Sequence, residues 1–405
     1  QVKEDGNFRE ADYHEALVLI AKRMQSIGAK YGKDAIAVSI SDRYTNEEAY
    51  AIKKMANVIG AKVLCMNARE NGLAEVLGFD ASPNTIDELL STNVILKVGF
   101  NEEDSRVISL KLKQAAEAGA RILDVCNGEN GLGFLKEIAK AIVDSGKAKK
   151  AEGYDAFAAS LADVNVSDAA KEIADAYLGA KKAMIVYQQN NLTVDAAKLI
   201  GDIALLSGHI GGPRNGILMI KPKNNSQGLV DMGIHAGKEA LDGVKALFVF
   251  GENADINTDA LEFLAVCDTH MTELAAKADV VLPGTGFAST DGTYTNTERR
   301  LQPVNAAIDE DIFLSNWEIA AEIAEIFEDV FGWETEQDIS DEMCDTVPAY
   351  KYAEIGEVLG GVLAPTDEAK LVVVSNGAAF DALPCTDSLM QCITDRLPKP
   401  ANPTA

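Results

Sequence analysis

Short apolar runs alternate with amphipathic stretches along most of the chain. The runs are hydrophobic throughout, which is typical of parallel strands covered by helices on both faces. Strands are predicted at 35–39, 94–98, 121–125, 183–187, 246–250, 280–282 and 371–374. A helical period predicts helices at 13–27, 46–59, 105–118 and 194–206. The pattern therefore predicts an α/β fold with doubly wound, mostly parallel sheets.

Polar residues and glycines follow most of these predicted strands, among them Ser41, Gly99, Gln188 and Gly284. In parallel α/β sheets, ligands bind beyond the carboxyl ends of the strands, where loop amides and helix N-termini face outwards. This predicts a crevice suited to an elongated polar or phosphorylated ligand. The alternative is an ordinary set of strand-end turns, since doubly wound proteins commonly end their strands in this way.

Charge and cysteine content narrow the classes of partner. The 405 residues include 37 Lys+Arg and 63 Asp+Glu, a formal net charge of -26. Such a charge repels nucleic acid and anionic lipid. No apolar run is long enough to span a membrane, and the start at Gln1 lacks a signal-peptide pattern. The six scattered cysteines form no C-x-x-C pair, so we expect no disulfide framework, a cytoplasmic location and no membrane insertion.

Several short phrases stand in a fixed order. They are 44–48 (YTNEE), 71–78 (NGLAEVLG), 224–228 (NNSQG), 231–233 (DMG), 278–283 (ADVVLP) and 291–300 (DGTYTNTERR). Together they resemble the molybdopterin oxidoreductase superfamily over residues 8–335. The two most similar branches are the formate dehydrogenase catalytic subunit, and the large iron-sulfur subunit of NADH dehydrogenase (complex I) with its soluble electron-bifurcating relatives.

The resemblance implies two interwoven Rossmann-like domains, similar to domains II and III of formate dehydrogenase. One domain would comprise 1–62 plus 221–335 and the other 63–220, followed by a C-terminal extension over 336–405. In the catalytic branch, the crevice between the domains holds two molybdopterin guanine dinucleotides and molybdenum or tungsten. The matching positions are expected to face this cofactor or its vestigial pocket. They are Asn101, Asn225, Gln227, Asp231, Gly251, Asn253, Asp291, Thr293, Thr295 and Asn296.

The expected catalytic positions depart from the family pattern. Cys65 is placed by the resemblance at the Cys or selenocysteine that binds the metal, and the following family His is matched by Met66, which has no titratable proton. The family Arg that orients the substrate carboxylate is matched by Lys221, which lacks a planar bidentate fork. The alternative for Cys65 is a small buried thiol at a strand end, which is the more common role of a free cysteine.

These departures lead to three hypotheses. The first is a cofactor-free scaffold, without catalytic or metal-binding residues, in an NADH- or ferredoxin-linked electron-transfer complex whose other subunits carry flavin and iron-sulfur clusters. The second is a formate dehydrogenase-type enzyme that binds a molybdenum or tungsten bis-pterin cofactor, with Cys65 on the metal and Lys221 in the active site. The third is a free-standing α/β module that binds a small phosphorylated ligand. Pro398, Pro400 and Pro403 predict an extended C-terminal arm, and the favoured alternative is a frayed terminus.

Overall fold

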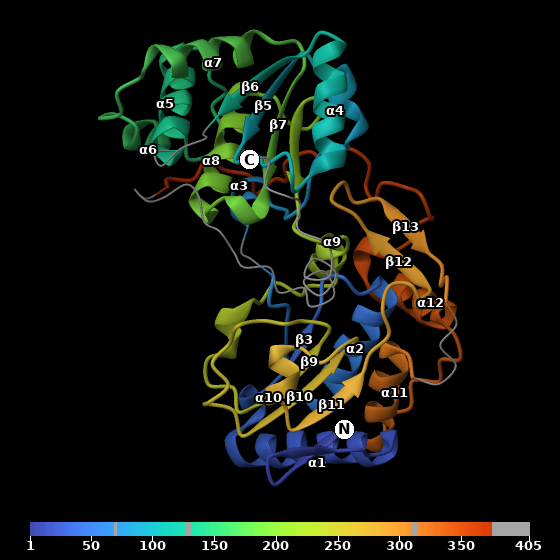
Figure 1. The fold of residues 1–405 in the computed structure, drawn as a ribbon. Coiled ribbons are helices and arrows are strands. Elements are labelled where there is room, and N and C mark those ends of the chain that lie inside the picture. The colour runs from blue at the N-terminus through green and yellow to red at the C-terminus, as the bar shows by residue number, and fades with distance from the viewer. Residues whose placement is uncertain (69–70, 126–130, 309–313, 375–405) are drawn as a thin grey trace, which may run out of the picture.

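Two mostly parallel sheets organise the molecule in a computed structural model that describes residues 1–68, 71–125, 131–308 and 314–374 (Figure 1). The first sheet has the order β2-β1-β11-β10-β9-β3-β4 and the second the order β6-β5-β7-β8. In the first sheet β11, β10, β9, β3 and β4 are parallel, with antiparallel β1 and β2 at one edge. All four strands of the second sheet are parallel. The predicted α/β fold class with mostly parallel sheets is confirmed.

The strands have the following bounds. The first sheet contains β1 (Val2–Glu4), β2 (Asn7–Arg9), β3 (Ile36–Ile40), β4 (Lys62–Leu64), β9 (Ala246–Phe250), β10 (Phe263–Asp268) and β11 (Val280–Pro283). The second sheet contains β5 (Val94–Val98), β6 (Arg121–Val125), β7 (Ala183–Gln188) and β8 (Gly216–Ile220). A separate antiparallel hairpin is formed by β12 (Gly292–Thr295) and β13 (Leu301–Val304).

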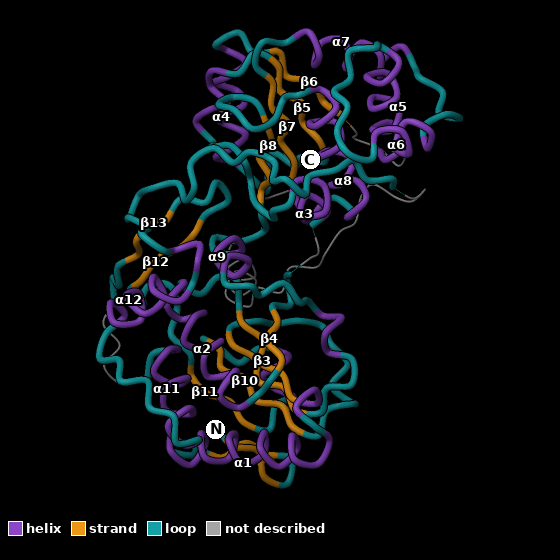
Figure 2. Tube along the Cα trace, turned by 180° about the vertical axis from the view of Figure 1, so that it is seen from behind, coloured by secondary structure: helices purple, strands orange, loops and turns teal. Residues whose placement is uncertain are grey.

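Helices cover both faces of each sheet. They are α1 (Tyr13–Tyr31), α2 (Asn46–Ile59), α3 (Gly72–Leu77), α4 (Arg106–Glu117), α5 (Gly131–Asp144), α6 (Tyr154–Ser160), α7 (Asp168–Gly179), α8 (Val194–Ser207), α9 (Ser226–Asp231), α10 (Glu273–Lys277), α11 (Asn316–Ile326) and α12 (Glu336–Thr346). Short 3-10 helices lie at Lys33–Ala35, Asp87–Ser91, Gln189–Asn191, Lys238–Leu241 and Pro348–Tyr350. Figure 2 shows α9 between the two sheets, where the chain returns from the second to the first.

The start of α2 illustrates how local sequence sets an element. The Thr45 hydroxyl accepts the Glu48 backbone N–H at 3.1 Å, and the Glu48 carboxylate accepts the Thr45 backbone N–H at 2.8 Å. This reciprocal capping box satisfies two backbone donors at the helix N-terminus. Gly60 ends the helix in a left-handed conformation. The predicted bounds 46–59 are therefore those observed.

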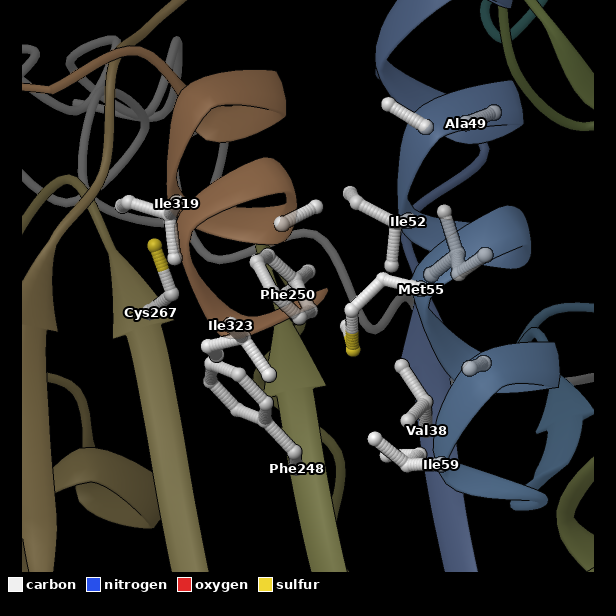
Figure 3. Close-up of a cluster of buried hydrophobic side chains, with 14 of the residues drawn as sticks. Val38, Ala49, Ile52, Met55, Ile59, Phe248, Phe250, Cys267, Ile319 and Ile323 are labelled. Carbon is white, nitrogen blue, oxygen red and sulfur yellow. The ribbon is translucent and has the colours of Figure 1, made fainter. Parts of the chain in front are cut away.

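The first sheet gains its core from alternate residues of its central strands. Phe248 and Phe250 of β9 face α2 and α11, and their ring centroids lie 4.2 Å apart (Figure 3). Ile52 of α2 and Ile323 of α11 close this layer. Burying each such side chain stabilises the fold by about 1.5–3 kcal/mol. The intervening β9 residues pack on the opposite face, against α10, so the sheet is covered on both sides.

The predicted strand at 371–374 is wrong. This segment runs without strand pairing and is fixed by single hydrogen bonds, with the Leu371 N–H donating to the Glu152 carbonyl at 2.8 Å and the Val372 N–H to Asp202 Oδ1 at 2.9 Å. Leu371 and Val374 are buried in the core of the second sheet. The apolar run therefore reflects burial against helices instead of a place in a sheet. Pro398, Pro400 and Pro403 lie outside the described residues.

The described tail ties the two sheets together. After α12, which packs on α2 through a 2.5 Å ion pair between Lys54 and Glu342, the chain crosses to the second sheet. Buried Arg299, at the β12–β13 turn, donates to the carbonyls of Ser82 (2.8 Å) and Gly361 (2.6 Å). The guanidinium thus joins the loop before the second sheet to the tail. Within the described ranges, the helices include none long and apolar enough to cross a membrane.

Candidate functional site

A pocket of about 300 Å³ lies at the carboxyl ends of the first sheet's strands, which we call the strand-end pocket. Its volume is at the lower end of the range for small-molecule sites. The segments after β3, β9 and β11 and the end of β10 contribute to its wall, as expected for a doubly wound sheet. It is lined by Ser41, Arg43, Tyr44, Glu48, Asn224, Gly251, Asp268, Thr269, Thr285, Gly286, Phe287, Thr290, Tyr294 and Val304.

A glycine shapes one wall of the strand-end pocket. Gly251 follows β9 with φ +69°, and a Cβ added there would lie 2.7 Å from the Tyr44 ring. Only glycine combines this left-handed backbone with such a close aromatic neighbour. The turn after β9 can therefore pass directly over Tyr44 and keep the pocket open.

A hydroxyl in the strand-end pocket is available for a ligand. The Thr285 side chain is buried, and its Oγ1 has no hydrogen-bond partner among the described residues. Buried polar atoms are normally paired, because an unmade hydrogen bond costs about 1–3 kcal/mol. Its backbone N–H, by contrast, donates to Asn316 Oδ1 at 3.2 Å. The geometry leaves Thr285 Oγ1 as a contact point for a polar ligand.

Glu48 is a buried acid in the same wall. Besides its capping role, its carboxylate accepts the Asn316 amide at 2.7 Å. Burial raises the pKa of Glu48 to about 7, despite the hydrogen bonds from Thr45 and Asn316 that favour its charged form. The pocket wall therefore changes charge near neutral pH. The phenol of Tyr294, also in the wall, has its pKa raised by burial to about 12 and stays neutral.

A second, much smaller cavity of about 20 Å³ lies where the two sheets meet, and we call it the inter-domain pocket. It combines residues following β3, β4, β7 and β8 with α9, and its volume suits about one water-sized group. It is lined by Asp42, Cys65, Asn67, Ala68, Gln189, Lys221, Pro222, Ser226, Leu229, Val230, Ile234 and His235. Two residues singled out from the sequence, Cys65 and Lys221, are thus brought to one pocket.

Cys65 faces a buried carboxyl. Its thiol donates to Glu252 Oε1 over 3.7 Å, and the same oxygen accepts the Met66 N–H at 3.0 Å. The Ser39 hydroxyl donates to the other carboxyl oxygen. Burial, with the nearby Asp42 and Glu252 carboxyls, raises the pKa of the Cys65 thiol well above its usual value. The neutral thiol is favoured, and these contacts are those of an interior hydrogen-bonding group.

Lys221 is held in an enclosed ion pair. Its Nζ lies 2.9 Å from Asp80 Oδ1, which also accepts the Asn71 amide at 2.7 Å. The Lys221 side chain is only 1% exposed. Its backbone N–H donates to Thr297 Oγ1 at 2.8 Å. An ammonium carries three N–H donors. Among the described residues, the acceptor that the Lys221 ammonium reaches is Asp80.

The residues expected to face a cofactor divide into groups. Gly251 lines the strand-end pocket, and Gln227 and Asp231 lie on α9 beside Lys221. The exposed Asn101 lies at the end of β5 in the second sheet, where its amide donates to Asp104 at 2.7 Å. The structure therefore does not bring the predicted set to one surface.

The remaining predicted residues bond to other parts of the protein. Asn225 Oδ1 accepts the Thr295 N–H at 2.8 Å, and the hydroxyl of Thr293 donates to Glu47 at 2.9 Å. Asn253, Asp291 and Asn296 accept backbone N–H groups through their side-chain oxygens at 3.0–3.3 Å. Most of these side chains organise the loops behind the pockets.

Sequence reasoning missed several residues that line the strand-end pocket, notably Tyr44, Glu48, Asp268, Thr285 and Tyr294. Tyr44, Glu48 and Tyr294 lie within the phrases 44–48 and 291–300, so the sequence phrases already pointed to these positions. Asp268 ends β10, a strand that the periodicity did not predict. Thr285 lies in the polar segment after the strand predicted at 280–282, and its unpaired hydroxyl is shown only by the structure.

Comparison with known proteins identifies a family. The family model described as Molybdopterin oxidoreductase matches residues 1–326. The F420-dependent formate dehydrogenase 2 subunit alpha of Methanococcus maripaludis is 28% identical over 443 residues, covering 86% of this chain and 65% of that protein. A probable oxidoreductase, YjgC of Bacillus subtilis, is 25% identical over 86% of this chain and 45% of its own length. The chain thus spans about two thirds or less of these relatives.

Two solved structures share the fold. Acetylene hydratase from Pelobacter acetylenicus has a TM-score of 0.64 at 15% identity, covering 90% of this chain and 67% of that chain. A chain of the formyltransferase/hydrolase complex from Methylorubrum extorquens has a TM-score of 0.52 at 15% identity, covering 81% and 98%. At this identity the likeness concerns the fold alone.

The family match confirms the resemblance predicted from the sequence phrases and corrects one expectation. A chain without any cofactor was expected, because Met66 and Lys221 differ from the catalytic pattern. The match over residues 1–326 to the molybdopterin oxidoreductases contradicts that expectation, since membership implies binding of a molybdopterin cofactor. Substitutions at two positions were too narrow a basis for expecting no cofactor, because most of a large cofactor is held by other residues.

Proposed function

The chain belongs to the molybdopterin oxidoreductase family, and from this premise we propose that it is the pterin-binding part of a formate dehydrogenase-type catalytic subunit. The observation that carries the proposal is the strand-end pocket with its unpaired Thr285 hydroxyl. Relatives described as formate dehydrogenase alpha subunits support the reaction type. This catalytic reading is better supported than the cofactor-free scaffold.

The residues of the strand-end pocket, whose volume is about 300 Å³, fit part of a nucleotide-bearing pterin. Thr285 Oγ1 offers a hydroxyl, Arg43 a cation for phosphate, and Asp268 a carboxylate for the N–H donors of a base. Tyr294 and Phe287 offer aromatic faces. When bound, the cofactor would supply the two-electron redox chemistry that none of these side chains can perform. The role of these residues is to bind and orient it.

Cys65 does not fit equally well as a metal ligand. The Cys65 thiol is enclosed and donates to the buried Glu252 carboxyl over 3.7 Å. Its contacts favour the interior role that was the alternative from the sequence. Lys221 retains a place in the proposal as a positive charge at the wall of the inter-domain pocket. Asp80 holds that ammonium in position.

The assembly state is part of the proposal. Relatives are described as subunits, so we place this chain in a complex whose partner subunits carry flavin or iron-sulfur clusters and pass the electrons on. A cytoplasmic location follows from the same proposal. We expect the partners to co-purify with the chain when it is isolated from its own cells.

The test is formate-dependent reduction of an artificial dye by the full chain, isolated with its natural partners under reducing conditions. Wild type is expected to reduce the dye, and Thr285→Val to lose activity together with bound pterin. Thr285→Ser keeps the hydroxyl and is the matched control. A wild-type protein that contains pterin but does not oxidise formate would contradict the reaction assignment while leaving cofactor binding intact.

A further inference from the structure

An amide side chain lies directly behind the strand-end pocket. Asn316, the first residue of α11, is fully buried and does not line the pocket itself. Its Oδ1 accepts the Thr285 backbone N–H at 3.2 Å, and its Nδ2 donates to the Thr285 carbonyl at 3.1 Å. One side chain therefore holds both backbone polar groups of the residue whose hydroxyl is unpaired in the pocket.

The remaining hydrogen-bonding capacity of Asn316 is used as well. Its Nδ2 also donates to Glu48 Oε1 at 2.7 Å, and its Oδ1 also accepts the Cys267 thiol over 3.7 Å. A primary amide has two N–H donors and one oxygen with two lone pairs. These four contacts fill that capacity, so Asn316 acts on a ligand of the pocket only through the residues that it holds.

The contacts of Asn316 require an amide. Its two donors face oxygens, the Thr285 carbonyl and the Glu48 carboxyl, while its acceptor faces the Thr285 N–H. A carboxylate of the same shape would set a third oxygen against these two, and buried polar contacts of that kind are costly. Glu48 is itself fixed, because its carboxylate accepts the Thr45 backbone N–H at 2.8 Å. Asn316 thus ties Thr285 to the N-terminus of α2.

The loop that carries Thr285 approaches Asn316 closely and then closes on itself. A Cβ added to Gly284 would lie 3.1 Å from Asn316 Oδ1, a tight contact that glycine avoids. After Thr285, the Thr290 hydroxyl donates to the Gly286 carbonyl at 3.1 Å. Thr285, Gly286 and Thr290 all line the strand-end pocket. The place at which Asn316 holds the loop therefore sets the position of this part of the wall.

We propose that Asn316 is a positioning residue of the strand-end pocket, which aims the Thr285 hydroxyl at the bound cofactor by holding the Thr285 backbone. The inference deepens the proposed function, on which it rests for the identity of the ligand. A hydroxyl that is already ordered loses less conformational entropy on binding than one on a loose loop. Release of the loop is expected to lower the pterin content of the chain by about tenfold or more.

Two variants and two readouts test the role of Asn316. Asn316→Asp keeps the shape and the acceptor for the Thr285 N–H but replaces the donor to the Thr285 carbonyl with an oxygen. Asn316→Ser removes the amide without adding a charge beside Glu48, and it serves in case Asn316→Asp does not fold. Pterin is measured per full chain isolated from its own cells. Hydrogen–deuterium exchange of residues 284–290 is measured on full chain from cells that make no pterin.

Two control variants separate positioning from general effects of charge and stability. Asn257→Asp adds the same charge at an exposed position, where the side-chain oxygen accepts the Asp259 N–H at 2.9 Å and a carboxylate does so equally well. Ile323→Ala lies on the same helix as Asn316 and destabilises the buried core through a cavity. Both controls are expected to keep the pterin content and the slow exchange of 284–290 that wild type shows.

The proposal is supported if both folded Asn316 variants lose pterin and exchange faster over 284–290 than wild type and the controls. A folded Asn316 variant with wild-type pterin content overturns it, as does unchanged exchange of 284–290. Urea unfolding gives the stability of each variant. If Ile323→Ala loses as much pterin as an Asn316 variant of equal stability, the loss follows stability and the positioning role is overturned as well.

The two readouts also separate this inference from the proposed function. Wild type without pterin contradicts the proposed function, and the exchange data then decide the inference alone. Faster exchange in the Asn316 variants supports Asn316 as the residue that orders the Thr285 loop, and equal exchange overturns it. A chain that binds pterin through an ordered loop but oxidises no formate supports the inference and contradicts only the reaction assignment.

Discussion

The ammonium of Lys221 and the carboxylate of Asp80 form an enclosed ion pair, with 2.9 Å between Nζ and Oδ1. Asp80 follows α3, and Lys221 follows β8, so the pair joins two loops at the junction between the sheets. The Asn71 amide and the Gln227 amide fix the same loop through Asp80. The ion pair therefore fixes the position of the Lys221 ammonium at the wall of the inter-domain pocket.

Removal of one partner of this pair should be costly. Asp80→Asn is expected to lower the free energy of unfolding by about 3–5 kcal/mol, because it removes the hydrogen-bonded counter-charge of a buried ammonium. The double variant Asp80→Asn with Lys221→Met should recover part of this loss. Urea unfolding of the single and double variants measures the coupling. Strictly additive losses would show that the pair contributes no interaction of its own.

Glu48 should make stability depend on pH. Its pKa is near 7 in the folded protein, above the ordinary value of 4.5, so the folded state binds more protons than the unfolded state between these pH values. The contribution of Glu48 to the free energy of unfolding is therefore greatest below pH 4.5. It falls by about 3 kcal/mol as the pH rises to 7.

Glu48→Gln tests this, since glutamine can occupy the same position of a capping box. The difference in unfolding free energy between the variant and wild type should shift in favour of the variant from pH 4.5 to 8. Chemical unfolding at each pH provides the values. A difference that is constant across this range would assign the pH dependence to other groups.

Cys65 should be an interior thiol. Burial and its contact with Glu252 predict very slow reaction with an alkylating reagent in the native state, slower than that of the partly exposed Cys344. Cys65→Ala is expected to retain molybdenum or tungsten at the wild-type stoichiometry, measured by mass spectrometry of the purified protein. Loss of the metal with the fold intact would instead identify Cys65 as its ligand.

The sequence was most informative where the determinants are local. The bounds of α2 follow from Thr45, Glu48 and Gly60, which lie within or next to the helix itself. Apolar runs located the central strands for the same reason. The segment 371–374 has the same composition but no strand beside it, and strand pairing depends on distant residues that a local pattern does not contain.

The pockets were only partly predictable because they assemble from distant segments. Gly251 followed a predicted strand and does line the strand-end pocket, but its neighbours Tyr44 and Thr285 are brought there by the fold. The phrase residues Asn225 and Thr295 bond to each other across 70 positions. The family-like sequence phrases therefore identified residues that build the loops as well as residues that line the pocket.

The pterin content of the purified chain, measured after oxidation to its fluorescent derivative, tests the central claim most directly when wild type, Gly251→Ala and Gly243→Ala are compared. Both glycines have positive φ, but only at Gly251 does an added Cβ meet Tyr44, while at Gly243 nothing lies within 4 Å. The account predicts bound pterin in wild type and Gly243→Ala, and its loss from folded Gly251→Ala. Wild-type protein without pterin, or equal pterin in all three, would contradict it.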